Sequence, residues 1–221
     1  MKQPYWKRFL ICLAGLAIFA LGNYMGVKAG SAGSNAWTTL SLGLADLFGT
    51  TFGTANLAVG LVIIGIDLLG KGKLGVGTLM NAVLISWFSD VFLRILQFIP
   101  QAPNQFVGVL YTLTAQFLGA FSTILYMTAG LGCGPRDTLM VLIGRRFPRA
   151  PIGLVKFCIE VLALTAGVLL GAPFGVGTIL IVILQASIFQ LACKLTRYEP
   201  RAIVHEDVRE TLQGLLGKTD G

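Results

Sequence analysis

The chain has 221 residues, of which 55% are hydrophobic and only 12% are charged, and its mean hydropathy is +0.78. An ordinary soluble domain carries about 25% charged residues, so this composition excludes a water-soluble globule and predicts an integral membrane protein. The net charge of +7 does not indicate nucleic-acid binding, because the 17 Lys and Arg residues flank apolar segments and form no basic face studded with aromatic rings.

Long apolar runs predict helices that cross the bilayer. About 20 apolar residues span the hydrocarbon core as a helix, whereas barrel strands are alternating segments of ~10 residues, and these runs do not alternate. Two weaker helical segments cover residues 35–52 and 135–149. The first run lacks a signal-peptide cleavage site, so we interpret it as a retained span. In chain order, the six predicted spans are residues 9–27, 54–69, 74–99, 106–130, 152–170 and 175–195.

Basic residues near the span ends predict the orientation. Lys2, Lys7 and Arg8 place the amino terminus in the cytoplasm, and the later basic clusters then fall on the same side while the outer loops carry almost no charge. We therefore expect a multi-pass protein of the bacterial plasma (inner) membrane with both termini cytoplasmic. The predicted parts are a cytoplasmic start (1–8), a membrane unit (9–99), an outer loop (100–105), a second membrane unit (106–196) and a cytoplasmic amphipathic tail (197–221).

An internal repeat relates the two membrane units. The sequence GVGT at residues 75–78 returns at 175–178, and Thr39-Leu40 matches Thr138-Leu139 at nearly the same interval. Each unit has three spans, an odd number, so the second copy must enter from the opposite face. The predicted fold is an all-α polytopic membrane protein of two inverted three-helix repeats, each with a short extra helix that is re-entrant or interfacial. We interpret GVGT as a tight turn into a closely packed span.

Two pairs of charged residues lie near span ends at helical i,i+4 spacing. Asp67 precedes Lys71 in this register, and Asp90 precedes Arg94. Each spacing predicts an interfacial ion pair.

Lys156 and Glu160 lie deeper in the membrane. Glu160 follows the start of its span by eight residues, which places it about 12 Å along the helix, close to the middle of a core about 30 Å thick. The two side chains share one helix face. They either neutralise each other as a structural pair or line a polar cavity.

Uncharged polar residues occupy corresponding positions in the other spans. Asn56 and Gly60 are the first-repeat counterparts of Lys156 and Glu160, and they would line the opposite wall of such a cavity. Asn81, Gln185 and Gln190 add amide groups from the third and sixth spans. Together these residues predict a central polar site.

Arg136 and Asp137 begin the second weak segment, where Trp37 and Thr38 hold the matching places in the first. If both segments dip into the membrane, their amino ends aim partial positive charge inward. If both lie on the membrane surface, Trp37 is an interfacial anchor. The sequence leaves both readings open.

The stretch TAGLGCGPRDTLM (128–140), followed by KFCIEVLALTAGVLLGAPFGVGT (156–178), resembles the YczE/YyaS/YitT family of bacterial integral membrane proteins. Where that family has Pro-Trp-Asp, this chain has Ala36-Trp37-Thr38. The resemblance implies a plasma-membrane helical bundle and supplies no substrate. The positions that match the family motifs are Gly134, Pro135, Arg136, Asp137, Lys156, Glu160, Gly175 and Thr178.

The remaining features bear on catalysis and partners. The sole histidine, His205, lies in the tail, where apolar residues at helical spacing predict an amphipathic helix on the inner membrane surface. No histidine within the bilayer can act as a base or metal ligand, so we expect no enzyme, catalytic residue, metal or cofactor. The four cysteines share no metal or redox spacing, which predicts free thiols.

Two functions remain in view. The first is a small-molecule transporter whose substrate or coupling ion contacts a polar site between the repeats. The second is a non-transporting membrane partner or scaffold that docks or stabilises another protein through its basic loop and tail. The expected partners are the lipid bilayer and a small-molecule substrate, or a protein partner or second copy of the chain, and no nucleic acid. The predicted site comprises Lys156, Glu160, Arg136, Asp137, Asn56, Trp37, Asn81 and Gln185.

Overall fold

The computed structural model describes residues 4–198 and 206–216. Over this part of the chain there are nine α-helices, one short 3-10 turn and no strand, so the all-helical prediction is confirmed. The elements are α1 (Tyr5–Lys28), η1 (Gly30–Ala32), α2 (Ala36–Phe48), α3 (Phe52–Leu69), α4 (Val76–Ile95), α5 (Gln105–Thr128), α6 (Pro135–Arg146), α7 (Ile152–Leu169), α8 (Val176–Thr196) and α9 (Val208–Leu215).

Five of the described helices, α1, α3, α4, α5 and α8, are long and apolar enough to cross a membrane, by length and composition. The predicted span at 152–170 forms α7, which has 18 residues and is not one of these five. The two weaker segments form the short helices α2 and α6. The chain is therefore a helical protein with several membrane-spanning helices.

Local chemistry sets the helix starts. Asn35, Thr51 and Asn104 each accept a hydrogen bond from the backbone N–H three residues later, at 3.0, 3.1 and 2.9 Å. Such caps satisfy N–H groups that have no partner within the helix. Helix α6 begins with Pro135 at its first position, where a missing N–H costs nothing.

One predicted helix end is wrong. Helix α4 stops at Ile95, although the apolar run continues to residue 99. Proline disfavours helical backbone at the residue before it, and Pro100 follows the run directly. The four residues after Ile95 therefore form turns instead of another helical turn.

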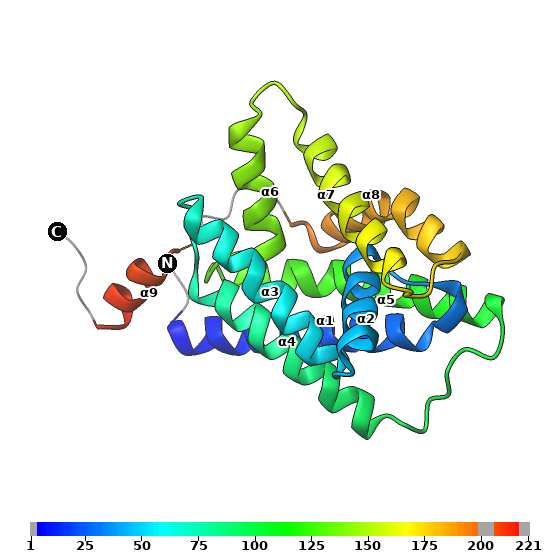
Figure 1. Ribbon diagram of the computed structural model, residues 1–221. Coiled ribbons are helices and arrows are strands. Elements are labelled where there is room, and N and C mark those ends of the chain that lie inside the picture. The colour runs from blue at the N-terminus through cyan, green and yellow to red at the C-terminus, as the bar shows by residue number, and fades with distance from the viewer. Residues whose placement is uncertain (1–3, 199–205, 217–221) are drawn as a thin grey trace.

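Helices α1 and α5 run antiparallel through the middle of the molecule, as Figure 1 shows. A Cβ added at Gly15 would lie 2.8 Å from the Tyr126 nitrogen, and one at Gly22 would lie 3.0 Å from the Ala115 oxygen. Residue numbers increase along α1 while the numbers of the residues that it contacts on α5 decrease, so the two helices are antiparallel. Small residues let the two backbones approach this closely.

The other helices pack between the two halves of the chain as well as within them. Helix α1 packs on α4, and α5 packs on α8. Helix α2 packs on α7, and α3 packs on α6. At the α2–α7 contact, a Cβ on Gly43 would come 2.8 Å from the Gly167 oxygen, so these backbones nearly touch.

Each GVGT turn packs against the loop of the opposite half. Gly77 N donates to Leu131 O at 2.7 Å, and a Cβ on Gly177 would come 2.8 Å from Ala32 O. Gly33 has a φ of +78°, and a Cβ there would lie 2.1 Å from Thr178 Oγ1. No other residue type fits this backbone and this space. The predicted packing role of GVGT is confirmed.

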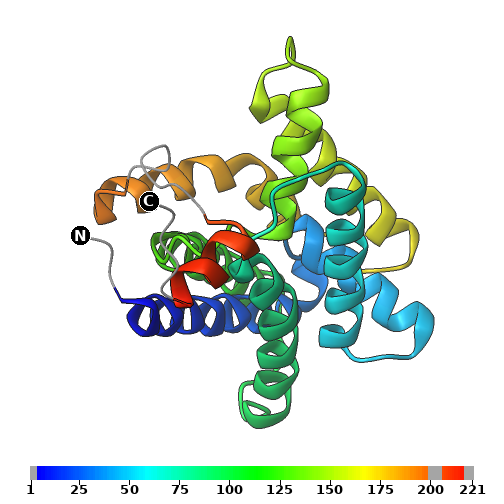
Figure 2. The same cartoon turned by 90° about the vertical axis from the view of Figure 1, so that its left-hand side faces the viewer.

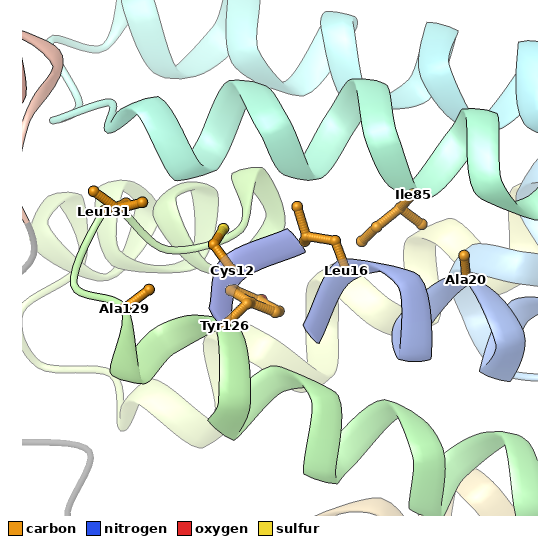
Figure 3. Close-up of a cluster of buried hydrophobic side chains, with 7 residues drawn as sticks. All are labelled: Cys12, Leu16, Ala20, Ile85, Tyr126, Ala129 and Leu131. Atoms are coloured by element: carbon orange, nitrogen blue, oxygen red, sulfur yellow. The ribbon is translucent and has the colours of Figure 1, made fainter. Parts of the chain in front are cut away.

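A buried cluster joins α1, α4, α5 and the loop after α5, and Figure 3 shows its seven side chains. The outward faces carry exposed apolar side chains instead, such as Leu61, Leu162 and Ile183. Apolar residues on both the inside and the outside are what a lipid environment requires. The seven cluster residues are Cys12, Leu16, Ala20, Ile85, Tyr126, Ala129 and Leu131.

The described part of the tail forms α9, which lies beside the start of α1 in Figure 2. Arg8 Nη1 lies 2.9 Å from Glu206 Oε1 in a buried ion pair, and Arg8 Nε donates to Ala129 O at 2.7 Å. Thr211 is fully buried, whereas Leu212 and Leu215 are exposed. Helix α9 is thus anchored to the protein, and its exposed leucines lie away from this contact. His205 lies outside the described residues.

Candidate functional site

One cavity of about 450 Å³ lies between the two halves of the chain. Every helix from α1 to α8 contributes to its lining, including the amino ends of α2 and α6. All eight residues of the predicted site line it. These residues are Trp37 from α2, Asn56 from α3, Asn81 from α4, Arg136 and Asp137 from α6, Lys156 and Glu160 from α7, and Gln185 from α8.

Arg136 is held in place on two sides. Its guanidinium carbon lies 4.7 Å from the centroid of the Trp37 ring, and its Nη2 donates to Asn56 Oδ1 at 3.0 Å. Asn56 is buried and donates in turn to Ser86 Oγ at 2.9 Å, and Ser41 Oγ lies 3.4 Å from Asn56 Oδ1. Residues of α2, α3 and α4 thus hold a guanidinium group that α6 carries.

Glu160 has an amide donor and a more distant cation. Gln185 Nε2 donates to Glu160 Oε2. Lys156 Nζ lies 3.9 Å from Glu160 Oε1, which is within ion-pair distance but too long for a hydrogen bond. The Lys156 side chain is 50% exposed and that of Glu160 is 13% exposed. The two readings of this pair are therefore compatible, since the residues pair loosely and both line the cavity.

Three polar groups surround Gly134, the residue before α6. A Cβ there would lie 3.1 Å from the Tyr126 hydroxyl, 3.3 Å from Asp137 Oδ2 and 3.4 Å from Asn81 Nδ2. A side chain at this position would intrude on all three groups. The glycine thus lets the first turn of α6 approach α4 and α5.

Cys133 also lines the cavity, in the loop before α6. Its Sγ lies 3.5 Å from Thr138 Oγ1. Burial raises the pKa of this thiol above its usual value, so it stays protonated and unreactive at neutral pH. None of the four cysteines, which all lie within the described residues, forms a disulfide, as the sequence predicted.

Several lining residues escaped the sequence reading. Asn23 on α1, and Gln116 and Tyr126 on α5, face the cavity together with Asn35 at the cap of α2. Asn23 and Gln116 could have been found from the sequence, because each is an amide within an otherwise apolar span, and such a group needs a polar neighbour in lipid. Asn23 Nδ2 lies 3.5 Å from Ser89 Oγ, which gives one such neighbour.

Two positions expected to line the cavity, Gln190 and Gly60, do not line it. Gln190 is exposed, since it lies more than one turn beyond Gln185 on α8. Gly60 packs against α4, where a Cβ added to it would lie 3.1 Å from the Ala82 methyl group. Thr38, which holds the place that matches Asp137, is buried and does not line the cavity.

Both predicted interfacial ion pairs are wrong. Asp90 accepts hydrogen bonds from Gly53 N at 2.7 Å and from the Thr51 hydroxyl, so it caps the start of α3 instead of pairing with Arg94. The N–H of Gly53, which the Thr51 cap does not use, competes with Arg94 for this carboxylate, and a negative charge at a helix start also suits the helix dipole.

The Asp67 carboxylate is fully buried, and neither oxygen has a hydrogen-bond partner among the described residues. Helix α3 ends at Leu69, and Lys71 has a φ of +57°, outside the helix. The i,i+4 geometry that would have brought Lys71 over Asp67 is therefore lost at this helix end.

These features define a class of protein: a helical integral membrane protein with several candidate spans around a partly open cavity that polar and apolar side chains line together. The chain belongs to the YczE family of membrane proteins. Residues 6–194 match the family model described as "Family of unknown function (DUF6198)".

Two relatives support this assignment. The chain is 32% identical over 195 residues to "Uncharacterized membrane protein YczE" of Bacillus subtilis (strain 168), covering 87% of this chain and 88% of that one. It is 34% identical over 187 residues to an "Uncharacterized protein" of Haemophilus influenzae, covering 84% and 83%. No solved structure matches the chain. The resemblance stated from the motifs is confirmed.

Proposed function

We propose that this protein is a small-molecule transporter of the plasma membrane, with its substrate site in the cavity between two inverted repeats. The observation that carries the proposal is the convergence of four ionisable side chains, Arg136, Asp137, Lys156 and Glu160, on one cavity. Each such group near the bilayer centre costs about 2.5–3.5 kcal/mol on insertion scales. Because the protein bears this cost for four side chains in one cavity, we infer that their charges serve a function.

Reciprocal packing supports the inverted repeats. Helices α1, α2, α3 and α4 correspond in order to α5, α6, α7 and α8, and the contact of α2 with α7 has its counterpart in the contact of α6 with α3. Likewise, each GVGT turn packs against a loop of the opposite repeat. In this arrangement α7 is the fifth of six spans in chain order, since 18 residues give about 27 Å of helix, close to the hydrocarbon thickness of about 30 Å.

The placement of α2 and α6 supports the re-entrant reading. The amino end of each helix lines the cavity, while Leu47 and Phe48 near the carboxyl end of α2, and Arg145 and Arg146 at the end of α6, are exposed. A discontinuous helix with its positive dipole end at a midplane site is how many transporters hold charged substrates. The two short helices would serve this purpose here.

Transport can be tested in liposomes that contain the purified protein. Uptake would be screened with labelled amino acids, organic acids, amines and sugars. Glu160→Gln removes one cavity charge and should abolish uptake of any transported solute, whereas Gln190→Ala, on the exposed face of α8, should leave uptake unchanged. Absence of uptake for every solute class, with the protein folded and oriented, would contradict the proposal.

The alternative is a partner or scaffold role, and the exposed basic segment at the end of α6 and just after it favours this role. Arg145, Arg146 and Arg149 are all exposed beside exposed Phe147. In this alternative, replacing the three arginines with glutamine removes the phenotype of the protein in cells, and Glu160→Gln does not. The transporter proposal expects the opposite outcome.

A further inference from the structure

We infer that the cavity takes a small zwitterion of the amino-acid type, with its carboxylate at Arg136 and its ammonium at Glu160. This inference rests on the proposed transport function and specifies the substrate class of the same site. It follows from the signs and the surroundings of the charged groups that line the cavity.

Arg136 is built to receive an anion. A guanidinium group carries five N–H donors in one plane, and the hydrogen bond from Arg136 to Asn56 Oδ1 uses one of them. The Trp37 ring covers one face of that plane and fixes its direction. A carboxylate matches the spacing of two parallel guanidinium donors. The amino end of α6, where Arg136 lies, adds partial positive charge on the same side.

Glu160 is built to receive a cation. Its Oε2 accepts from Gln185, which orients the carboxylate, and its Oε1 faces the Lys156 ammonium at 3.9 Å. At that distance Lys156 makes no hydrogen bond to Oε1, so the acceptor capacity of this oxygen is not used by Lys156. Lys156 is half exposed and sits on a flexible stem. Its ammonium group therefore stands in for a substrate ammonium, which can approach Glu160 to hydrogen-bond distance while Lys156 moves aside.

The charge balance selects a zwitterion over a simple ion. Two cations, Arg136 and Lys156, and two carboxylates, Asp137 and Glu160, line the cavity. A substrate with one net charge would leave a charge without compensation in a low-dielectric space, which is costly. A molecule that carries both charges leaves the balance unchanged and pairs with each end.

The rest of the lining suits an apolar side chain. Phe19, Ile85, Met127, Met140 and Phe189 complete the wall around the polar groups. A volume of about 450 Å³ lies within the range of sites for small organic molecules, roughly 300–1,000 Å³. We therefore expect amino acids with an aliphatic or aromatic side chain to bind more tightly than those with a polar one.

Thermal unfolding of the purified full-length protein tests this inference, with L-leucine as the first probe. Two analogues each lack one charge: 4-methylpentanoate has no ammonium, and L-leucinamide has no carboxylate. Because each analogue leaves a cavity charge unpaired, we expect it to bind about 100-fold more weakly than leucine. Arg136→Gln should abolish the preference for leucine over leucinamide, and Glu160→Gln should abolish the preference over 4-methylpentanoate. Gln190→Ala serves as the matched control and should preserve both.

The outcomes separate this inference from the transport proposal. Equal stabilisation by leucine and either analogue overturns the zwitterion, as does a lack of stabilisation by every standard amino acid. If a sugar, an amine or an organic acid is nevertheless taken up by liposomes, the transporter proposal stands and only the substrate class is wrong. Variants that fail to fold are replaced by Gln185→Leu, which removes the donor that orients Glu160 and should weaken leucine binding.

Discussion

Removal of the Glu206 carboxylate should detach the tail from the rest of the protein. Arg8 and Glu206 are both 7% exposed, and their ion pair joins the first helix to the start of the tail at 2.9 Å. Glu206 also accepts hydrogen bonds from the hydroxyl groups of Tyr5 and Thr211, each at 3.3 Å. Loss of one partner of a buried ion pair costs about 3–5 kcal/mol, mainly because the other charge is left buried and unpaired.

The segment 206–216 can undock without unfolding the membrane helices, so this cost should appear as local opening. The tail is also attached by two backbone hydrogen bonds, Glu206 N to Gly130 O at 2.9 Å and Val208 N to Leu74 O at 3.0 Å. In Glu206→Ala, amide hydrogens of the tail should exchange at least about 100-fold faster, which corresponds to the lower end of that range. Hydrogen exchange measured by mass spectrometry on the reconstituted protein checks this.

A double-mutant cycle supplies the control. Arg8→Ala should open the tail at least as strongly as Glu206→Ala, because it also leaves Ala129 O without its donor. The double variant should then lose far less than the sum of the two single effects. Arg145→Ala, at an exposed arginine, should change stability by no more than about 0.5 kcal/mol. Effects of Arg8 and Glu206 that add within about 0.5 kcal/mol would refute the reasoning.

Three further predictions concern stability and topology. Asp67→Asn should leave the free energy of unfolding unchanged or higher, because neither carboxylate oxygen has a hydrogen-bond partner to lose within the described part of the chain; a loss above about 2 kcal/mol in a thermal or detergent titration would contradict this. Gly33→Ala should prevent folding, since its Cβ would overlap the opposite half, whereas Gly49→Ala, with positive φ but nothing within 4 Å, should cost only about 1 kcal/mol. In intact cells, an impermeant thiol reagent should label Gln101→Cys and not Lys73→Cys; the reverse pattern would overturn the proposed orientation.

The sequence predicted the helices well because their limits depend on local chemistry. Apolar runs bounded by Gly, Pro and capping residues placed most helix starts within a few residues, as with Gln105 for a predicted start at 106. The error at the end of α4 had a local cause as well, in Pro100. The arginine and glutamate that become site residues were also visible, because a charge within an apolar span is unusual wherever it occurs.

Only the tertiary structure decided which polar groups meet. Asp90 caps a helix that begins 38 residues earlier in the sequence, and Arg8 pairs with a residue 198 positions away; neither partner is implied by spacing along one helix. Likewise, the eight predicted site residues come from six helices, and their meeting in one cavity depends on how those helices cross. Helix formation follows from short-range propensity and burial, whereas the pairing of charges follows from contacts between segments far apart in the chain.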